Sequence, residues 1–167
     1  MKPEYKYGLI TGAVVCLWTL AEFMLGFHTT HSSLGEYSGY FSAVIPLITL
    51  TLLLRSLQAT QGPLTLRRGL GAGLLASFIA ALLVYSFLLI YNHFIDPGWI
   101  DVALDGKVGL LRARGVSEVA IRQEIVSFRR MNGPLGLAVA ILGGMPLMGG
   151  SFSVIITLVL RRKVPGA

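Results

Sequence analysis

The stretch "LGAGLLASFIAALLVYSFLLIY", Leu70–Tyr91, contains no charged residue and decides what kind of protein this is. A helix rises 1.5 Å per residue, so about 20 apolar residues cross a hydrocarbon core of roughly 30 Å. Three further apolar blocks lie at 7–27, 39–54 and 135–160. Of the 167 residues, 54% are hydrophobic and 13% are charged, and the mean hydropathy is +0.71. This composition is too apolar for a soluble globular domain, so the sequence predicts an integral membrane protein.

We expect an all-α integral membrane protein with one four-helix transmembrane domain over residues 1–167. The predicted spans are 7–27, 38–54, 69–91 and 135–160, and two amphipathic helices are predicted at 97–114 and 117–132. The first apolar block is longer than the core of a typical signal peptide, and no small-x-small cleavage pattern follows it before His28. We therefore interpret it as a retained span. Cys16 is the only cysteine, so no intramolecular disulfide is expected.

Basic residues beside the membrane indicate the orientation of the spans, because positively charged flanks stay in the cytoplasm. They occur near both ends of the chain and after the second block, at Lys2, Lys6, Arg55, Arg67, Arg68, Arg161, Arg162 and Lys163. The link "HTTHSSLGE", residues 28–36, has no basic lysine or arginine. We therefore predict both termini in the cytoplasm (N-in/C-in) and the connection 92–134 on the outside. The net charge of +6 comes mostly from these flanks, so we expect no nucleic-acid binding.

The long external connection carries start and stop signals for two helices. Asp96 is placed to cap the first helix, with Pro97 at its first position. Gly115 is expected to end that helix. Ser117 is placed to cap the second helix, which is expected to end at Gly133. The sequence therefore predicts an extracytoplasmic amphipathic helical hairpin between the third and fourth spans.

The role of this hairpin stays open among three interpretations. It lies in the membrane interface with Trp99 as an anchor, it caps the bundle as a lid or docking surface, or it only connects two spans. Within its second helix, Glu118 and Arg122 have the i, i+4 spacing of an ion pair.

Small residues recur at every fourth position of the third span. Such stripes mark where helices approach closely in lipid, because little hydrophobic drive acts between membrane helices. The third span contains Gly69, Gly73, Ser77 and Ala81, and the fourth contains Gly136, Ala140 and Gly144. The first span contributes Gly8 and Gly12, and three helices with small-residue faces predict a tight bundle.

Two prolines lie inside the predicted spans. Pro46 interrupts the second span, and Pro146 lies in the fourth span within "GGMPLMGG", residues 143–150. A proline removes one helical hydrogen bond, so both positions predict a kink. At Pro146 the alternative is an unwound turn, of the kind that builds binding sites in transporters.

Six short segments, in their order along the chain, resemble a family of bacterial membrane proteins catalogued as domain of unknown function family 4199. They are "YGLITG" from Tyr7, "GYFSAVIPLI" from Gly39, "RRGLGAGLLASFIAALLVY" from Arg67, "FIDPGWID" from Phe94, "FRRMNGP" from Phe128 and "LRRK" from Leu160. The resemblance runs nearly from end to end of the chain. It implies a four-span, multi-pass protein of the bacterial inner (cytoplasmic) membrane, and it implies no activity.

Polar residues that the predicted topology brings to the outer face are candidates for ligand or proton handling. They are Glu22, His28, His31, His93 and Asp96. A charge at the bilayer centre costs about 3 kcal/mol on insertion scales and less near an interface, so Glu22 is either a working or a tolerated carboxylate. His28 and His31 are weak metal candidates, because "HTTH" lacks the helical spacing of a zinc motif. We expect no metal and no cofactor.

The sequence contains no phosphate loop, no nucleophile elbow and no cysteine cluster, so no catalytic residue is assigned. Our leading interpretation is a non-enzymatic inner-membrane protein, a small helical bundle that contacts membrane lipids or a partner. One alternative is a small transporter or a carrier of lipid or another hydrophobic ligand, with a site near Glu22 and Pro146. Another is a membrane enzyme with an external histidine site. Membrane lipids are the expected partners, and a homo-oligomer or a membrane-protein partner stays open.

Overall fold

The computed structural model describes residues 1–26 and 32–162, and all regular structure in these ranges is helical. The α-helices are α1 (Pro3–Met24), α2 (Ser32–Gln61), α3 (Leu66–Ile90), α4 (Trp99–Ala113), α5 (Glu118–Asn132), α6 (Pro134–Ala138) and α7 (Met145–Arg162), and two π-helical segments are η1 (Tyr91–Ile95) and η2 (Val139–Gly144). Four stretches are long and apolar enough to cross a membrane: Pro3–Met24, Ala43–Gln61, Leu66–Ile95 and Pro134–Arg161. The prediction of an all-α chain with four candidate membrane-spanning helices is confirmed.

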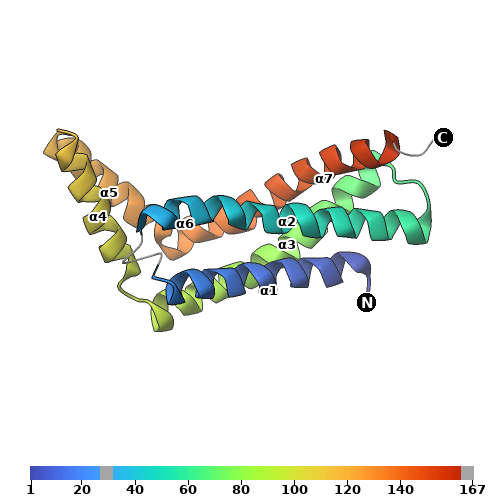
Figure 1. Ribbon diagram of the computed structural model, residues 1–167, viewed down its shortest axis with the longest axis horizontal. Helices are drawn as coiled ribbons and strands as arrows, with labels where there is room; N and C mark the ends of the chain where they lie inside the picture. The colour runs from blue at the N-terminus through green and yellow to red at the C-terminus, as the bar shows by residue number, and fades with distance from the viewer. Residues whose placement is uncertain (27–31, 163–167) are drawn as a thin grey trace.

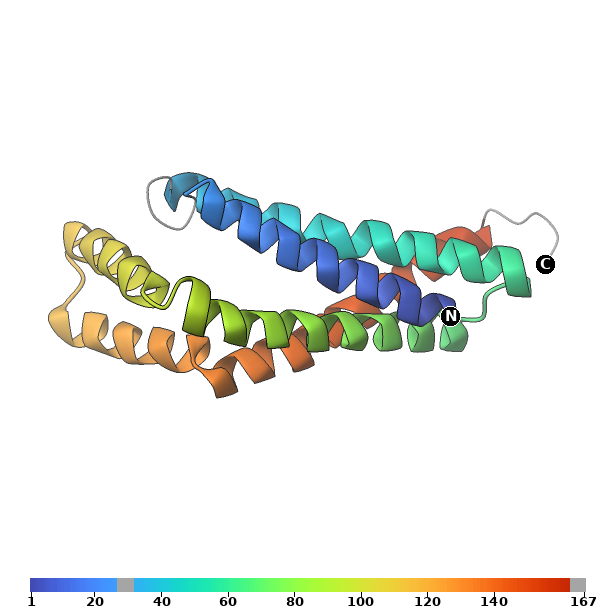
Figure 2. The same ribbon diagram turned by 90° about the horizontal axis from the view of Figure 1, so that it is seen from below.

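The spanning helices form an elongated bundle with a helical hairpin at one end (Figure 1). The start of α1, the link between α2 and α3 and the end of α7 lie together at the opposite end. Each of α1 and α7 packs against both α2 and α3, so α1 and α7 occupy opposite corners of the bundle. From the second direction, α4 leaves the end of α3 and α5 returns to the fourth span (Figure 2). One end of the bundle therefore carries the α4–α5 hairpin, and the other end carries the chain termini and the α2–α3 link.

The second helix is longer than the predicted span 38–54. It begins at Ser32, passes through Pro46 without a break and ends at Gln61. Gly62 then takes a positive φ of 81°, a conformation that glycine adopts without steric cost. The helical turns after residue 54 contain polar residues, so the length of the apolar stretch does not predict them.

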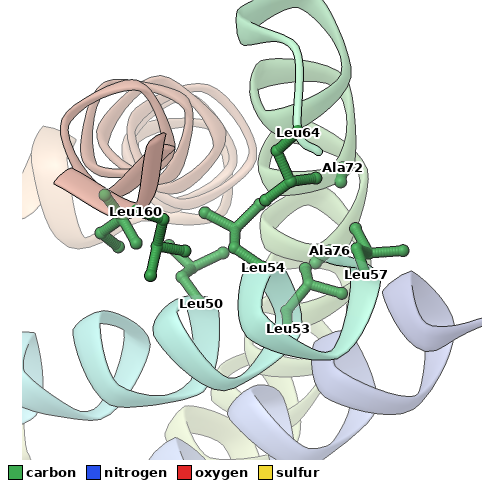
Figure 3. Close-up of a cluster of buried hydrophobic side chains, with 9 residues drawn as sticks. Leu50, Leu53, Leu54, Leu57, Leu64, Ala72, Ala76 and Leu160 are labelled. Carbon is green, nitrogen blue, oxygen red and sulfur yellow. The ribbon is translucent and has the colours of Figure 1, made fainter. Parts of the chain in front are cut away.

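The hydrophobic core lies in the half of the bundle where α2 ends, α3 begins and α7 ends, near the chain ends (Figure 1), and its side chains are drawn in Figure 3. Leucines of α2 interdigitate with alanines of α3 and with the end of α7; the buried cluster comprises Leu50, Leu53, Leu54, Leu57, Leu64, Ala72, Ala76, Ile156 and Leu160. Leu53, Leu54 and Leu57 are fully buried. This half of the bundle is therefore filled by side chains.

Helices α3 and α7 meet along a seam in which glycines face hydroxyl side chains. A Cβ atom built on Gly69 would overlap the hydroxyl of Thr157, and one built on Gly73 would overlap the hydroxyl of Ser153. The buried Ser153 and Thr157 hydroxyl oxygens have no hydrogen-bond partner among the described residues. Each oxygen lies where a Cβ would lie, which is the position for a weak Cα–H···O contact between helices. Glycine is therefore required at these two positions by close approach.

The fourth span meets this seam with different residues from those expected. Ala140 and Gly144 are exposed, and a Cβ at Gly144 would meet nothing within 4 Å. Gly149 instead lies against Ser77 of α3. The physical reason is η2, because a π-helical segment adds residues to the turn and rotates the face that follows. η2 ends directly before Met145 and Pro146, so the predicted disruption takes the form of a widened helix without an unwound turn.

Candidate functional site

The third span ends in η1, which turns the chain toward the hairpin. The backbone N–H of Asp96 donates to the carbonyl of Tyr91 (3.0 Å), and the Tyr91 hydroxyl donates to the Asp96 carboxylate (3.4 Å). The prediction that Asp96 caps the next helix is wrong. Helix α4 begins at Trp99 with Gly98 at the N-cap position, because Asp96 already serves the end of η1.

Trp99 attaches the hairpin to the end of the third span. Its indole N–H donates to the side-chain oxygen of Asn92 (2.8 Å), and its ring packs edge-on against Phe128 of α5, with 6.5 Å between ring centroids. Across the same junction, the Tyr85 hydroxyl donates to the carbonyl of Pro134 (3.4 Å). These contacts fix the start of α4 and the start of α6 relative to α3.

A cavity of about 350 Å³ lies at this junction of bundle and hairpin. Its walls come from the end of α3, η1, α4 and the α5–α6 corner: Leu89, Asn92, His93, Ile100, Asn132, Gly133, Pro134 and Leu137. The Asn132 amide N–H donates to the carbonyl of Phe128 (2.9 Å), which leaves the amide oxygen to accept. Because Asn92 accepts from Trp99 through its oxygen, its amide nitrogen is placed to donate. The junction cavity therefore combines apolar walls with the amide groups of Asn92 and Asn132 and the imidazole of His93.

The structure brings only some of the predicted site residues to this cavity. His93 lines it, whereas Glu22 does not. Glu22 is buried on α1, is engaged by a neighbouring group and lies close enough to Tyr91 for an electrostatic interaction. His28 and His31 lie outside the described residues. Within the described residues, no three histidine, cysteine or acidic side chains gather as a metal site.

Two cavity residues were missed by sequence reasoning. Asn92 and Asn132 are forty positions apart; Asn92 lies in none of the quoted segments, and Asn132 lies in "FRRMNGP" without a role assigned to it. A weak signal existed for Asn132, because it is the last residue of α5 and directly precedes Gly133 and Pro134. Because the fourth candidate span begins at Pro134, the polar side chain of Asn132 is expected to lie at the membrane boundary.

The hairpin is held by ion pairs between its two helices. Lys107 pairs with Glu124, Arg129 with Asp101 (2.7 Å), and Arg112 with Glu118 (2.9 Å). Glu118 therefore accepts hydrogen bonds across the turn from Arg112, and the expected partner Arg122 acts on Glu118 only through its charge, because the turn brings Arg112 closer. Ser117 does cap α5, accepting from the N–H of Ala120 (3.4 Å), and Gly115 makes the turn with a φ of 72°.

Lowering the pH is expected to weaken the turn of the hairpin through Glu118. Two hydrogen bonds from Arg112 hold the pKa of Glu118 below its ordinary value. The stabilisation is therefore present above the ordinary glutamate pKa of about 4.3 and is lost as the pH falls through the lowered folded-state pKa. A carbon NMR titration of the Glu118 carboxyl measures this value. Arg112→Gln should return the pKa toward ordinary, and Arg114→Gln, which removes an equal charge nearby, should not; equal effects would contradict the pairing.

Comparison with known proteins gives one family. The family model described as "Protein of unknown function (DUF4199)" matches residues 6–162. No curated protein and no solved structure gives a significant match.

Proposed function

This chain belongs to the DUF4199 family, and from that premise we propose that it is a non-enzymatic multi-pass membrane protein that binds a lipid where its hairpin meets the bundle. The junction cavity is the observation that carries the proposal. It combines the apolar Leu89, Ile100 and Leu137 with the polar Asn92 and Asn132 at the end of a spanning helix. An amphipathic ligand places its polar group and its chain in such surroundings at the same time.

The amide donors and acceptors of the cavity suit the glycerol and ester region of a lipid. The Asn132 oxygen accepts and the Asn92 amide donates, so both kinds of hydrogen bond are provided. The cavity does not reach Glu22, so lipid binding is assigned to the junction and not to that carboxylate. The lining of the cavity does not bring two acidic, basic or nucleophilic side chains together, which favours binding over catalysis.

The same proposal includes an orientation. The starts of α1 and α3 and the ends of α2 and α7 carry lysines and arginines, and these ends lie together on one side of the bundle (Figure 1). Basic flanks favour the cytoplasm, which supports cytoplasmic termini and an extracytoplasmic hairpin in a bacterial inner membrane. A homo-oligomer and a membrane-protein partner stay predictions.

Filling the cavity tests lipid binding. Leu137→Trp adds bulk to a lining position and is expected to lower the fraction of protein that retains lipid by about tenfold, a loss of about 1.4 kcal/mol. Native mass spectrometry of protein extracted in mild detergent measures the retained lipid. Leu135→Trp is the matched control, because Leu135 lies on the same helix, is 84% exposed and does not line the cavity. Equal retention in the two variants would refute the junction as the lipid site.

A further inference from the structure

The outward face of α5 is exposed among the residues that the structure describes, and its composition is unusual. Ile121 is buried beneath the helix and Phe128 packs on Trp99, so this side of α5 faces α4. On the outward face, Val119 and Val126 are 68% and 67% exposed. Arg122 and Arg130 flank Val126 at intervals of four residues and are exposed as well. The outward face therefore alternates apolar and cationic side chains along one line of the helix.

The arginines on this face differ from the others that belong to the hairpin helices. Arg112 and Arg129 are each held by a carboxylate of the hairpin. Arg122 and Arg130 form no ion pair with any residue whose side chain the structure describes, and Arg122 acts on Glu118 only through its charge. The nearest acid in sequence to Arg122, Glu118, is occupied by Arg112. Two guanidinium groups are therefore left to bind an anion from outside the chain.

An open hollow of about 410 Å³ lies against these groups. Its lining is Arg122, Gln123, Val126, Ser127 and Arg130. Guanidinium, amide and hydroxyl donors surround a central valine, so the hollow offers several donors to anionic oxygens and one apolar contact. Guanidinium groups bind phosphate with two parallel hydrogen bonds. This chemistry matches a phosphate that is joined to an apolar tail.

The chain holds this face close to the membrane surface. Only Gly133 separates α5 from α6, where the fourth candidate span begins at Pro134. The backbone carbonyl of Arg130 lies directly against Gly136 in the first turn of that span, so Arg130 is beside its start. Arg122 is about 12 Å further along α5, and the hairpin leans away from the bundle axis, so the height gained is smaller (Figure 1). Both arginines are within reach of lipid headgroups.

We propose that the outward face of α5, through Arg122 and Arg130, binds the phosphate groups of anionic phospholipids in the bilayer that the bundle spans. This inference rests on the proposed function only in placing the hairpin at a membrane surface. The two arginines select the lipid headgroup, whereas the junction cavity retains lipid through apolar walls and amide groups. An arginine near an anionic membrane surface is attracted electrostatically to the lipids, and added salt weakens this attraction by screening.

The test reconstitutes the full chain in nanodiscs of equal phosphatidylglycerol and phosphatidylcholine. Native mass spectrometry after release from the nanodisc measures the ratio of the two lipids retained on the protein. Wild type is expected to enrich phosphatidylglycerol on the order of tenfold over the bilayer ratio. The double variant Arg122→Gln/Arg130→Gln is expected to retain the two lipids in the bilayer ratio. Raising the salt concentration should reduce the wild-type enrichment and leave the variant unchanged.

The matched control is Arg112→Gln/Arg129→Gln, which removes the same charge from arginines that are already ion-paired. It should keep most of the enrichment. An equal loss in both double variants, or no enrichment in wild type, would overturn the proposal. If the glutamine pair fails to fold, Arg122→Lys/Arg130→Lys keeps the charge and should retain only part of the enrichment. Leu137→Trp should lower total lipid without changing the ratio, so failure at the cavity and failure at α5 are distinguishable.

Discussion

Replacing Gly73 with alanine is expected to destabilise the bundle by about 1–3 kcal/mol, the usual cost of overpacking a filled interior. The added Cβ would coincide with the hydroxyl oxygen of Ser153, which is fully buried and cannot move into open space. Helices α3 and α7 would have to separate along the whole seam. Equilibrium unfolding in mixed detergent, followed by circular dichroism, measures the free energy of unfolding.

Gly71 supplies the matched control on the same helix. A Cβ at Gly71 meets nothing within 4 Å, so Gly71→Ala should leave the free energy of unfolding unchanged or slightly raise it. Ser153→Gly should recover part of the loss in Gly73→Ala, because it removes the overlapping atoms, and the double-mutant cycle measures this coupling. Additive effects of the two substitutions would show that Gly73 and Ser153 do not meet.

Replacing Gly136 with alanine is expected to cost at least as much, about 1–3 kcal/mol, and to disturb the junction as well. Its Cβ would overlap the backbone carbonyl oxygens of Arg130 and Met131, at the corner where α5 turns into α6 through Gly133. A flexible side chain can rotate away, but these carbonyls belong to the last turn of α5. The corner must therefore open, which moves the walls of the junction cavity. Both the thermal midpoint and the retained lipid should fall.

Gly143 is the control for this substitution. It lies in the same candidate span, and a Cβ there would meet nothing within 4 Å. Gly143→Ala should leave both the thermal midpoint and the retained lipid at the wild-type level. If Gly136→Ala has the same thermal midpoint and retains the same amount of lipid as Gly143→Ala, the close contact between Gly136 and the end of α5 is contradicted.

The spans were predictable because crossing a membrane is a local property of the chain. A helix satisfies its own backbone hydrogen bonds, so apolar length alone identifies a candidate span. The same holds for the Ser117 cap and the Gly115 turn, where the signal and the structure lie within a few residues of each other. Each of these predictions succeeded because the residues that interact lie close together in the sequence.

Long-range partners were not predictable in this way. Glu118 has a residue of suitable charge four positions away, yet the hairpin turn brings Arg112 to it. His93 was singled out for its chemistry, but its cavity neighbour Asn132 comes from another helix and belongs to no motif of known chemistry. Such partners depend on how separate helices are placed, which periodicity along one helix does not report.

The sequence by itself determined that the chain is helical, with four candidate membrane-spanning helices and a small-residue face on the third of them. Only the tertiary structure decided which residues of the fourth span meet that face, because η2 rotates the helix so that Gly149 and Ser153 replace Ala140 and Gly144. It also decided where a cavity forms and which arginines of the hairpin helices a carboxylate holds. Length and composition set how many helices cross a membrane, but steric fit between helices sets which side chains they share.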